Sequence, residues 1–299
     1  MNAVKTQFSI KDLESLGGVK AHTIRIWEKR YNLLNPERTP TNIRTYTLKD
    51  LQKLLNVTFL LENKYKISKV AKHSSKEIAE IVADLVSKNN LSDNHAINSL
   101  KIAMMNFDQQ LFARTYESLS TVLSFREIFV QAFVPLLNEL GLLWQTDTIN
   151  PAHEHFITNL IKQKILLKIE QYQLDHSPTK SKTFVLFLPE NELHELGLMY
   201  LNYEIITSGY KCIYLGQSIQ LDSLKYLLTN QTNLHFVSYF TVKPEDQTVK
   251  DYVNDFNREL SSSKIPFYIL GKRAQQVDQS ELPDNVEIFH TIKDFAKVL

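Results

Sequence analysis

The strongest constraint on the fold is a change in the pattern of apolar residues at about residue 182. From there on, short apolar runs alternate with segments of helical periodicity, clearly at residues 184–188, 212–215, 236–240 and 267–270 and more weakly at 286–289. Strands that alternate with helices form parallel sheets, because each helix returns the chain to the same end of the sheet. Residues 182–299 are therefore expected to form a parallel α/β domain with binding loops at the carboxyl ends of its strands.

Residues 76–176 have a different periodicity, with apolar positions that recur at intervals of three and four. This spacing predicts helices at about residues 75–89, 92–104, 108–123, 125–144 and 151–174, which suit a helical bundle. Pro135 lies inside one of these helices, and we expect a kink there because proline has no N–H to donate.

The charge is uneven along the chain. The first 75 residues contain 14 Lys and Arg against 6 Asp and Glu, a net charge of +8, whereas the whole chain carries only +1. A basic region joined to an acidic body is typical of a head that binds a polyanion such as nucleic acid. An ordinary solvated surface is equally consistent with charge alone, so the residue pattern must distinguish the two.

Residues 1–75 show the pattern of two short helices joined by a tight turn. Ser9 is placed to cap a helix that ends at the glycine pair of residues 17–18, and a second helix is expected over residues 20–31. One side of the second helix is apolar or aromatic, and the opposite side carries His22, Arg25 and Lys29, which fits a helix that reads the major groove. Arg25 is the leading candidate for contact with bases or phosphates.

A proline-rich segment over residues 34–46 is too interrupted for a helix, and Arg38 and Arg44 bracket a turn within it. This arrangement predicts a wing with one arginine on each arm. The alternative is a plain helical hairpin whose arginines only keep it soluble. The agreement of order, spacing and charge favours the DNA-binding head.

Three segments of this head resemble the MerR family of winged-helix regulators: residues 23–31 (TIRIWEKRY), 38–40 (RTP) and 44–46 (RTY). The resemblance covers about the first 75 residues. It implies that Arg25, Arg38 and Arg44 contact DNA and that a dimer binds a twofold operator. The wing tip differs from many members, because residues 41–42 (TN) stand where glycines are common.

Trp144, Glu154 and His155 stand around the expected turn between the last two helices of the bundle. Taken alone, they form a common packing arrangement, in which an aromatic residue ends one helix and polar residues begin the next. His153 and His155 are two residues apart and therefore lie on different sides of a helix, which excludes a zinc site of the i, i+4 kind.

His194 follows the first expected strand, where a loop imidazole can ligate a metal while Glu192 holds its second nitrogen. Residues 192–197 (ELHELG) are similar to the E/D-x-H-x-x-G signature of Rossmann-like cobalamin-binding domains. The resemblance implies that His194 ligates cobalt and that the cofactor site includes Glu192, Gly197, Ser238 and Gly271. The chain departs from the family's Ser-x-Leu and Gly-Gly patterns, with SYF at 238–240 and GK at 271–272. A solvated loop histidine in a vestigial domain is the competing interpretation.

The three parts in this order resemble the CarH/LitR type of B12-dependent photoreceptor regulators. In that family a Trp, nine residues and Glu-His mark the cap over the cofactor, a spacing that Trp144, Glu154 and His155 reproduce. The resemblance implies adenosylcobalamin as the cofactor, with Trp144 packed against the adenosyl group and Glu154 and His155 in contact with it. It also implies double-stranded operator DNA as the partner, a homo-oligomer (dimer or tetramer), and release by light, with carotenoid-type genes as targets. Gln145 stands where a second cobalt-binding histidine is common, so a stable bis-histidine state is expected to be absent or to use another residue.

The expected architecture is therefore multidomain, α and α/β: a winged helix-turn-helix head at 1–75, a helical bundle at 76–176 and a Rossmann-like cobalamin-binding domain at 182–299. The apolar content of 43% and charged content of 22% exclude wholesale disorder. The first residues lack the apolar core of a signal peptide and no segment reads as a membrane span, so a cytoplasmic protein is expected. Cys212 is the single cysteine, and no nucleophile–base pair indicates an enzyme.

Two other functions stay open at this point. A MerR-type regulator with a vestigial cobalamin domain would sense another ligand or a protein partner, and the SYF and GK departures motivate this alternative. A corrinoid methyl carrier for an enzyme is the third function, and the basic head argues against it.

Overall fold

The computed structural model describes residues 7–88, 93–145, 149–244, 247–260 and 265–299, without certain side chains inside these ranges, among them those of Trp144 and Gln145. The chain forms two compact units, Met1–Ile161 and Lys162–Leu299, and each is described by itself. The first unit comprises the predicted head and the predicted bundle as far as Ile161, and residues 162–176 of the predicted bundle fall in the second unit. The three domain boundaries expected from the sequence stay a prediction.

The head has the expected two helices and wing. Its elements are β1 (Gln7–Phe8), α1 (Ile10–Gly17), α2 (Ala21–Tyr31), β2 (Glu37–Arg38), β3 (Arg44–Thr47), α3 (Leu48–Glu62) and α4 (Ile67–Val70). Ser9 caps α1 and exchanges hydrogen bonds with Asp12, and Gly18 ends the helix in the left-handed region at φ 67°. Strand β3 pairs antiparallel with β2 to form the wing and with β1 on its other edge. Strand β1 was not expected from the sequence.

The helical region follows the predicted helices closely. Its elements are α5 (Ser75–Lys88), α6 (Asp93–Asn106), α7 (Gln109–Ser120), α8 (Phe125–Ile128), the π-helix η1 (Phe129–Phe133), α9 (Val134–Gln145) and α10 (Pro151–Asp175). The sequence predicted a kink at Pro135, and the structure has a five-residue π-helix just before it. Because Pro135 offers no N–H to the preceding turn, the register widens there, and the Val134 N–H donates to the Phe129 carbonyl five residues back.

Helix α10 is 25 residues long, and the border between the two units falls within it, after Ile161. Its first turns belong to the helical region and its later turns to the α/β unit. Among the residues that the structure describes, no helix combines the length and the apolar character needed to cross a membrane.

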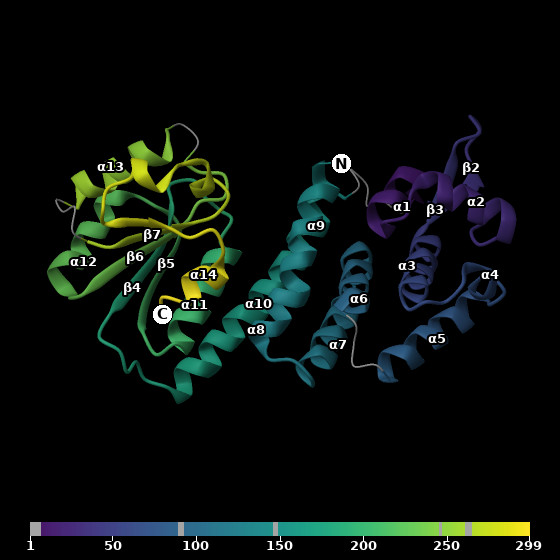
Figure 1. Cartoon of the computed structure of the whole chain (residues 1–299), viewed down its shortest axis with the longest axis horizontal. Helices are drawn as coiled ribbons and strands as arrows, with labels where there is room; N and C mark the ends of the chain where they lie inside the picture. The colour runs from purple at the N-terminus through teal and green to yellow at the C-terminus, as the bar shows by residue number, and fades with distance from the viewer. Residues whose placement is uncertain (1–6, 89–92, 146–148, 245–246, 261–264) are drawn as a thin grey trace. The chain divides into compact units, whose positions relative to one another are not determined.

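The second unit is the expected Rossmann-like domain, with helices on both faces of a five-stranded parallel sheet in the order β5-β4-β6-β7-β8 (Figure 1). The strands are β4 (Thr183–Pro189), β5 (Lys211–Ile219), β6 (Leu234–Tyr239), β7 (Phe267–Leu270) and β8 (Val286–Ile288). The helices are α11 (Leu196–Thr207), η2 (Leu221–Leu224), α12 (Lys225–Asn230), α13 (Val249–Glu259), η3 (Ala274–Gln276), η4 (Gln279–Glu281) and α14 (Ile292–Ala296).

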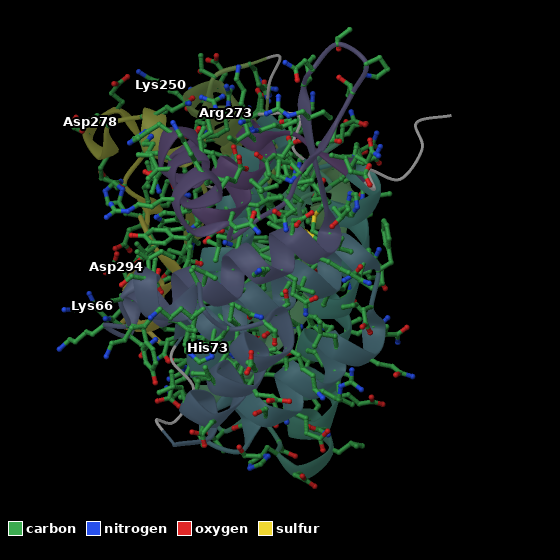
Figure 2. All side chains as sticks on the ribbon, turned by 90° about the vertical axis from the view of Figure 1, so that its right-hand side faces the viewer. Lys66, His73, Lys250, Arg273, Asp278 and Asp294 are labelled. Carbon is green, nitrogen blue, oxygen red and sulfur yellow. The ribbon has the colours of Figure 1, made fainter. Side chains whose placement is uncertain are left out.

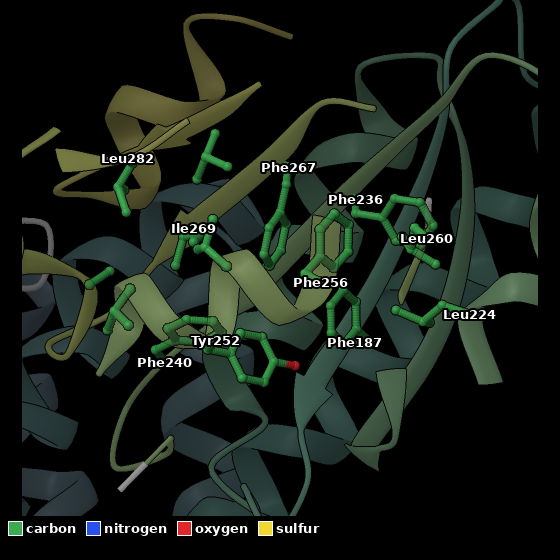
Figure 3. Packing of buried hydrophobic residues seen from close by; sticks show 14 of the residues in the cluster. Phe187, Leu224, Phe236, Phe240, Tyr252, Phe256, Leu260, Phe267, Ile269 and Leu282 are labelled. Atoms are coloured by element: carbon green, nitrogen blue, oxygen red, sulfur yellow. The ribbon is translucent and has the colours of Figure 1, made fainter. Parts of the chain in front are cut away.

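Strand β4 is an interior strand of the sheet, between β5 and β6, and is buried along its whole length. Its side chains alternate between two cores, because successive residues of a strand point to opposite faces. Val185 and Phe187 belong to one core, whose aromatic centre includes the Phe256 and Phe267 rings stacked 4.0 Å apart (Figure 3). Phe184, Leu186 and Leu188 belong to the core on the other face, under α11. This packing fixes the carboxyl end of β4, from which the candidate ligand loop emerges.

Candidate functional site

The exposed side of α2 carries the residues that the sequence singled out. His22, Arg25 and Lys29 are exposed, while Ile24 is fully buried on the opposite side. This amphipathic arrangement follows from the helical repeat. It leaves a basic face on the helix that follows the tight turn, as a groove-reading helix requires.

The wing arginines lie directly opposite each other, because Arg38 pairs in register with Arg44 across β2 and β3. Like charges at opposite positions repel, and each guanidinium has a partner that offsets this repulsion. Arg44 Nε donates to Glu28 Oε2 at 3.1 Å, and Arg38 Nη1 donates to Asn42 Oδ1 at 2.6 Å. The partners hold the two arginines in defined directions.

Glu28 is a residue that sequence reasoning missed. It lies on α2, its side chain is only 9% exposed, and its second oxygen accepts a hydrogen bond of 2.5 Å from the hydroxyl of buried Tyr46. Burial and this hydrogen bond raise the pKa of Tyr46 above its ordinary value. Glu28 therefore joins the reading helix to strand β3 of the wing. The available signal was a lone carboxylate within the basic run of α2.

The wing tip accommodates its departure from the glycine pattern. Asn42 has φ 65°, the left-handed conformation that favours glycine and that asparagine tolerates better than most residues. The Asn42 N–H donates to the Thr39 carbonyl at 2.8 Å and closes the turn. Asparagine thus takes the role of a glycine at this position and adds a side-chain acceptor for Arg38.

A further basic segment follows α3, and its lysines contribute to the net positive charge of the head. It contributes exposed lysines at Lys64, Lys66, Lys69 and Lys72. Figure 2 shows the Lys66 side chain extended away from the ribbon. These ammonium groups add to the positive surface of the head.

The loop after β4 holds His194 in a defined orientation. The imidazole is exposed, with 57% of its side chain accessible, and its Nδ1 lies 2.6 Å from Glu192 Oε1. Glu192 is 1% exposed and accepts four backbone hydrogen bonds. Its Oε1 accepts from the N–H groups of Leu193 and His194 at 3.0 Å, and its Oε2 accepts from those of Val242 at 2.7 Å and Lys243 at 2.8 Å. The carboxylate therefore links the ligand loop to the segment after β6.

The hydrogen bonds to Glu192 keep it ionised. Burial acts to raise the pKa of Glu192, but the hydrogen bonds from His194 and from the Lys243, Val242 and His194 backbone N–H groups outweigh it and lower the pKa to about 2. A carboxylate next to Nδ1 favours the imidazole tautomer with its proton on that nitrogen, so the lone pair lies on Nε2. This is the electronic form that a metal-ligating histidine needs.

Exposed apolar side chains occur in this loop, in the segment after β6 and on β5. Leu193, Val242 and Leu215 are 65%, 42% and 36% exposed. The loop itself is anchored to β5, because Gln217 Nε2 donates to the Leu193 carbonyl at 2.9 Å and the Asn191 N–H donates to Ser218 Oγ at 3.0 Å. The result is a fixed imidazole in a loop that also carries the exposed Leu193, which suits a large planar ligand with a metal at its centre.

Ser238, Gly197 and Gly271 take part in internal packing. Ser238 is fully buried, and its Oγ donates to the Phe187 carbonyl at 2.7 Å. A Cβ at Gly197 would stand 2.8 Å from Cζ of Tyr239, so the Tyr239 ring lies directly on this glycine. Gly271 has φ 101°, and a Cβ there would overlap the Phe240 carbonyl. These packing roles account for the residue types, and the cofactor contacts predicted for the three residues stay predictions.

The expected cap residues belong to the first unit, and the structure describes them incompletely. Trp144 lies in the last turn of α9 and its side chain is outside the described part, as is that of Gln145. Glu154 is half-buried and His155 exposed in the first turns of α10, whereas His153 is buried and stacks on Phe107 at 4.7 Å. The roles of Trp144, Glu154 and His155 over a cofactor stay predictions.

Comparison with known proteins agrees with both parts of this description. Residues 8–77 match the MerR HTH family regulatory protein model, and residues 96–167 match the B12 binding domain model. The chain is 26% identical over 222 residues to the HTH-type transcriptional repressor CarH of Myxococcus xanthus, which covers 73% of each chain. It is 22% identical over 213 residues to the HTH-type transcriptional repressor CarA of the same organism, which covers 69% of this chain and 67% of that one.

Among solved structures, the monomethylamine corrinoid protein of Methanosarcina barkeri has the same fold over 69% of this chain and 98% of its own, with a TM-score of 0.55 and 13% identity. At this level of identity the likeness shows a shared fold alone. The two Myxococcus xanthus relatives are transcriptional repressors by name, and residues 8–77 match a regulatory protein model. The chain thus joins a region that matches the MerR HTH family model to a region that matches the B12 binding domain model, and this combination supports a DNA-binding regulator under B12 control.

Proposed function

We propose that this chain is a transcriptional repressor whose binding to double-stranded operator DNA is controlled by adenosylcobalamin and its photolysis. The observation that carries the proposal is the Glu192–His194 pair, in which a buried carboxylate holds Nδ1 of an exposed imidazole at 2.6 Å. A single imidazole is a sufficient protein ligand for a metal whose equatorial positions a macrocycle fills. His194 is thus the cobalt ligand from the protein.

Glu192 tunes this ligand. Its negative charge raises the basicity of the imidazole, and its four backbone hydrogen bonds prevent the carboxylate from turning away. The exposed Leu193, Leu215 and Val242 give the face of the corrin an apolar surface on which to rest. Bound adenosylcobalamin supplies a cobalt–carbon bond that light breaks.

The head is the part of the chain that binds the operator. Arg25 on α2 and the directed Arg38 and Arg44 of the wing contact the operator, with His22 and Lys29 beside them on the reading face. The protein acts as a cytoplasmic homo-oligomer, a dimer or tetramer, on light-responsive genes of the carotenoid type. Control of DNA binding requires that the adenosyl form binds one state of the protein better than the other, because a ligand with equal affinity for both states shifts nothing.

Trp144, Glu154 and His155 are the residues assigned to the adenosyl side of the cofactor. The spacing in sequence supports this assignment, together with the B12 binding domain match, which includes all three. Gln145 supplies no imidazole, so photolysed protein is expected to show no bis-histidine cobalt spectrum.

The test is a visible absorbance spectrum of protein mixed with adenosylcobalamin in the dark, desalted and then illuminated. Wild type should keep the colour and change spectrum with light, and His194→Ala should retain the cofactor at least about tenfold more weakly. His290→Ala replaces another exposed histidine of the same unit and should behave like wild type. Equal retention by His194→Ala and His290→Ala would remove His194 as the cobalt ligand.

A regulator that senses a different ligand is the second candidate, and one observation favours it. Tyr239 and the Phe240 carbonyl lie against Gly197 and Gly271, so the glycines are used in packing within the domain. Wild-type protein that stays colourless after desalting, yet binds its operator, would support this candidate. A protein that binds cobalamin and no operator DNA would instead support a corrinoid carrier.

A further inference from the structure

The residue that follows His194 connects the ligand loop to two other elements. Glu195 Oε1 accepts a hydrogen bond from Lys162 Nζ on α10, and its Oε2 accepts one from the Tyr214 hydroxyl on β5 at 3.2 Å. The Glu195 side chain is 12% exposed and that of Lys162 is 38% exposed. Burial and the neighbouring Glu195 carboxylate raise the pKa of Tyr214, so its hydroxyl remains a donor. All three residues belong to the second unit.

Glu195 occupies the N-cap position of α11, but its side chain does not cap the helix. It is the N-cap residue of α11, where an acidic side chain commonly accepts hydrogen bonds from the first turn of the helix. Its side chain makes no such capping bond. The carboxylate is directed instead to Lys162, 33 residues away in the sequence.

Lys162 lies on the same helix as His155, one of the residues assigned to the adenosyl side of the cofactor. It lies seven residues after His155 on the same continuous helix. Seven residues correspond to about two helical turns, so the two side chains emerge from the same face of α10. A shift of the loop that carries His194 would therefore reach, through Lys162, the face of α10 that carries His155.

We propose that Glu195 is a positioning residue that couples the ligand loop to α10, so that a change at cobalt alters the helical region and hence DNA binding. This inference rests on the proposed function, because it takes His194 as the cobalt ligand. It adds a specific connection, the Lys162–Glu195–Tyr214 network, between the site where cobalt is bound and the helix assigned to the adenosyl side. Glu195 itself contacts neither cobalt nor DNA in this assignment.

The variants that test the proposal are Lys162→Met and Glu195→Gln, which remove one charge each. Lys162→Arg keeps the ion pair and serves as the rescue variant. Lys225→Met is the matched control, because Lys225 makes an ion pair with Glu259 at 2.6 Å in the same unit, between α12 and α13. Three quantities are measured: the visible spectrum of bound adenosylcobalamin, hydrogen exchange of the peptide 189–199 without cofactor, and the ratio of operator Kd without and with adenosylcobalamin in the dark.

We expect Lys162→Met and Glu195→Gln to keep the cobalamin spectrum of wild type, because His194 and Glu192 are intact. The ratio of operator Kd values should fall at least about tenfold towards one, within the usual range of a coupling between two sites. Exchange of the peptide 189–199 should quicken in the cofactor-free variants, because the loop has lost its anchor to α10. Lys162→Arg and Lys225→Met should retain the wild-type ratio and exchange.

The outcomes separate the inference from the function on which it rests. If wild type binds cobalamin and responds to it, and both Lys162→Met and Glu195→Gln keep the full ratio, the coupling role of Glu195 is wrong and the proposed function stands. If wild type itself binds no cobalamin, the proposed function fails and this inference fails with it. If the variants lose the cobalamin spectrum together with the ratio, Glu195 supports the site itself, and the coupling role is likewise overturned.

Discussion

The reading face of the head and the loop of His194 both present the proposed functional side chains at the surface, but they hold these side chains differently. Arg25 is an exposed, long side chain on a helix whose other side is packed. His194 is similarly exposed, yet its Nδ1 is held by a carboxylate that is 1% exposed and accepts four backbone hydrogen bonds. Attraction to DNA phosphates tolerates a mobile charge, whereas ligation of a metal requires a nitrogen at a fixed position.

This difference has a consequence for substitutions. A residue that acts only as an exposed charge can be replaced with little change in the free energy of unfolding. A residue that orients a ligand from within the fold contributes to folding and function together. The head contains both kinds, because Glu28 orients Arg44 from a nearly buried position while Arg25 lies outside.

The largest effect is expected for Glu192→Gln, which tests whether the buried carboxylate that holds His194 supports folding and cofactor binding together. The amide has one acceptor oxygen, and its NH₂ group opposes backbone N–H donors that the carboxylate now satisfies. We expect the free energy of unfolding to fall by about 3 kcal/mol and adenosylcobalamin to bind about 10–100-fold more weakly. Chemical denaturation and cofactor titration measure the two effects. A loss of cofactor binding with unchanged stability would show that Glu192 acts on the ligand alone.

The pH dependence of unfolding tests whether Glu192 is ionised in the folded chain. The pKa of Glu192 is lowered from 4.5 to about 2 in the folded chain. A carboxyl group with a lowered folded pKa contributes stability that is fully present above its unfolded pKa and is lost as the pH falls through the folded one. The difference in unfolding free energy between wild type and Glu192→Gln should thus be constant above about pH 5 and shrink between about pH 4.5 and pH 2. A difference independent of pH across this range would contradict the ionised assignment.

The second largest effect is expected for Glu28→Gln, which tests whether the wing is oriented or merely charged. Removing an acid raises the net charge of the head by one, and charge alone would strengthen operator binding. We expect the opposite, a loss of about tenfold, because Arg44 loses its ion pair and its fixed direction. Glu37→Gln on strand β2 makes the same change of charge at an exposed position and is the control. Equal or stronger operator binding by Glu28→Gln would mean that Arg44 needs no support.

The features that local patterns determine were predictable from the sequence. Alternating apolar runs gave the strands of the sheet, and Ser9 and the glycine pair after it gave the limits of α1. His194 was predicted to lie after the first strand with Glu192 beside it, because the two residues are close in sequence and the loop position follows from the topology. The order of the parts and the DNA-binding motif followed in the same way.

The contacts that were not predicted join residues distant in sequence. Glu28 meets Tyr46 across 18 positions, and Glu195 meets Lys162 across 33, so no local spacing indicates either pair. The Tyr239 ring against Gly197 likewise depends on the approach of β6 to the start of α11. The sequence predicted a kink at Pro135, and the structure has a π-helix just before it. A proline shows where a helix is disturbed but does not show how the backbone adjusts.

A comparable loss of operator binding, without a loss of stability, is expected for Arg25→Ala, which tests the exposed arginine of the reading helix. Loss of a contact to a base or phosphate should weaken operator binding by about 1–3 kcal/mol, while the free energy of unfolding stays within about 0.5 kcal/mol of wild type. Arg114→Ala replaces an exposed arginine on α7, outside the head, and should leave both quantities unchanged. Parallel losses of stability and operator binding in Arg25→Ala would place this residue with Glu28 as a structural support.

The smallest effect is expected for Asn42→Gly at the wing tip, where Asn42 orients the exposed Arg38. Glycine adopts φ 65° at least as well as asparagine, so the turn should form and the free energy of unfolding should change by less than about 0.5 kcal/mol. The variant removes the acceptor of Arg38 Nη1, and ordering a freed arginine on binding costs about 0.5–1.5 kcal/mol, so operator affinity should fall by a few-fold. In a background that already carries Arg38→Ala, Asn42→Gly should have no further effect on affinity, because the interaction between the two side chains is already absent. An equal loss in both backgrounds would show that Asn42 acts on DNA by itself, and the wing would then read DNA through its tip instead of through a directed arginine.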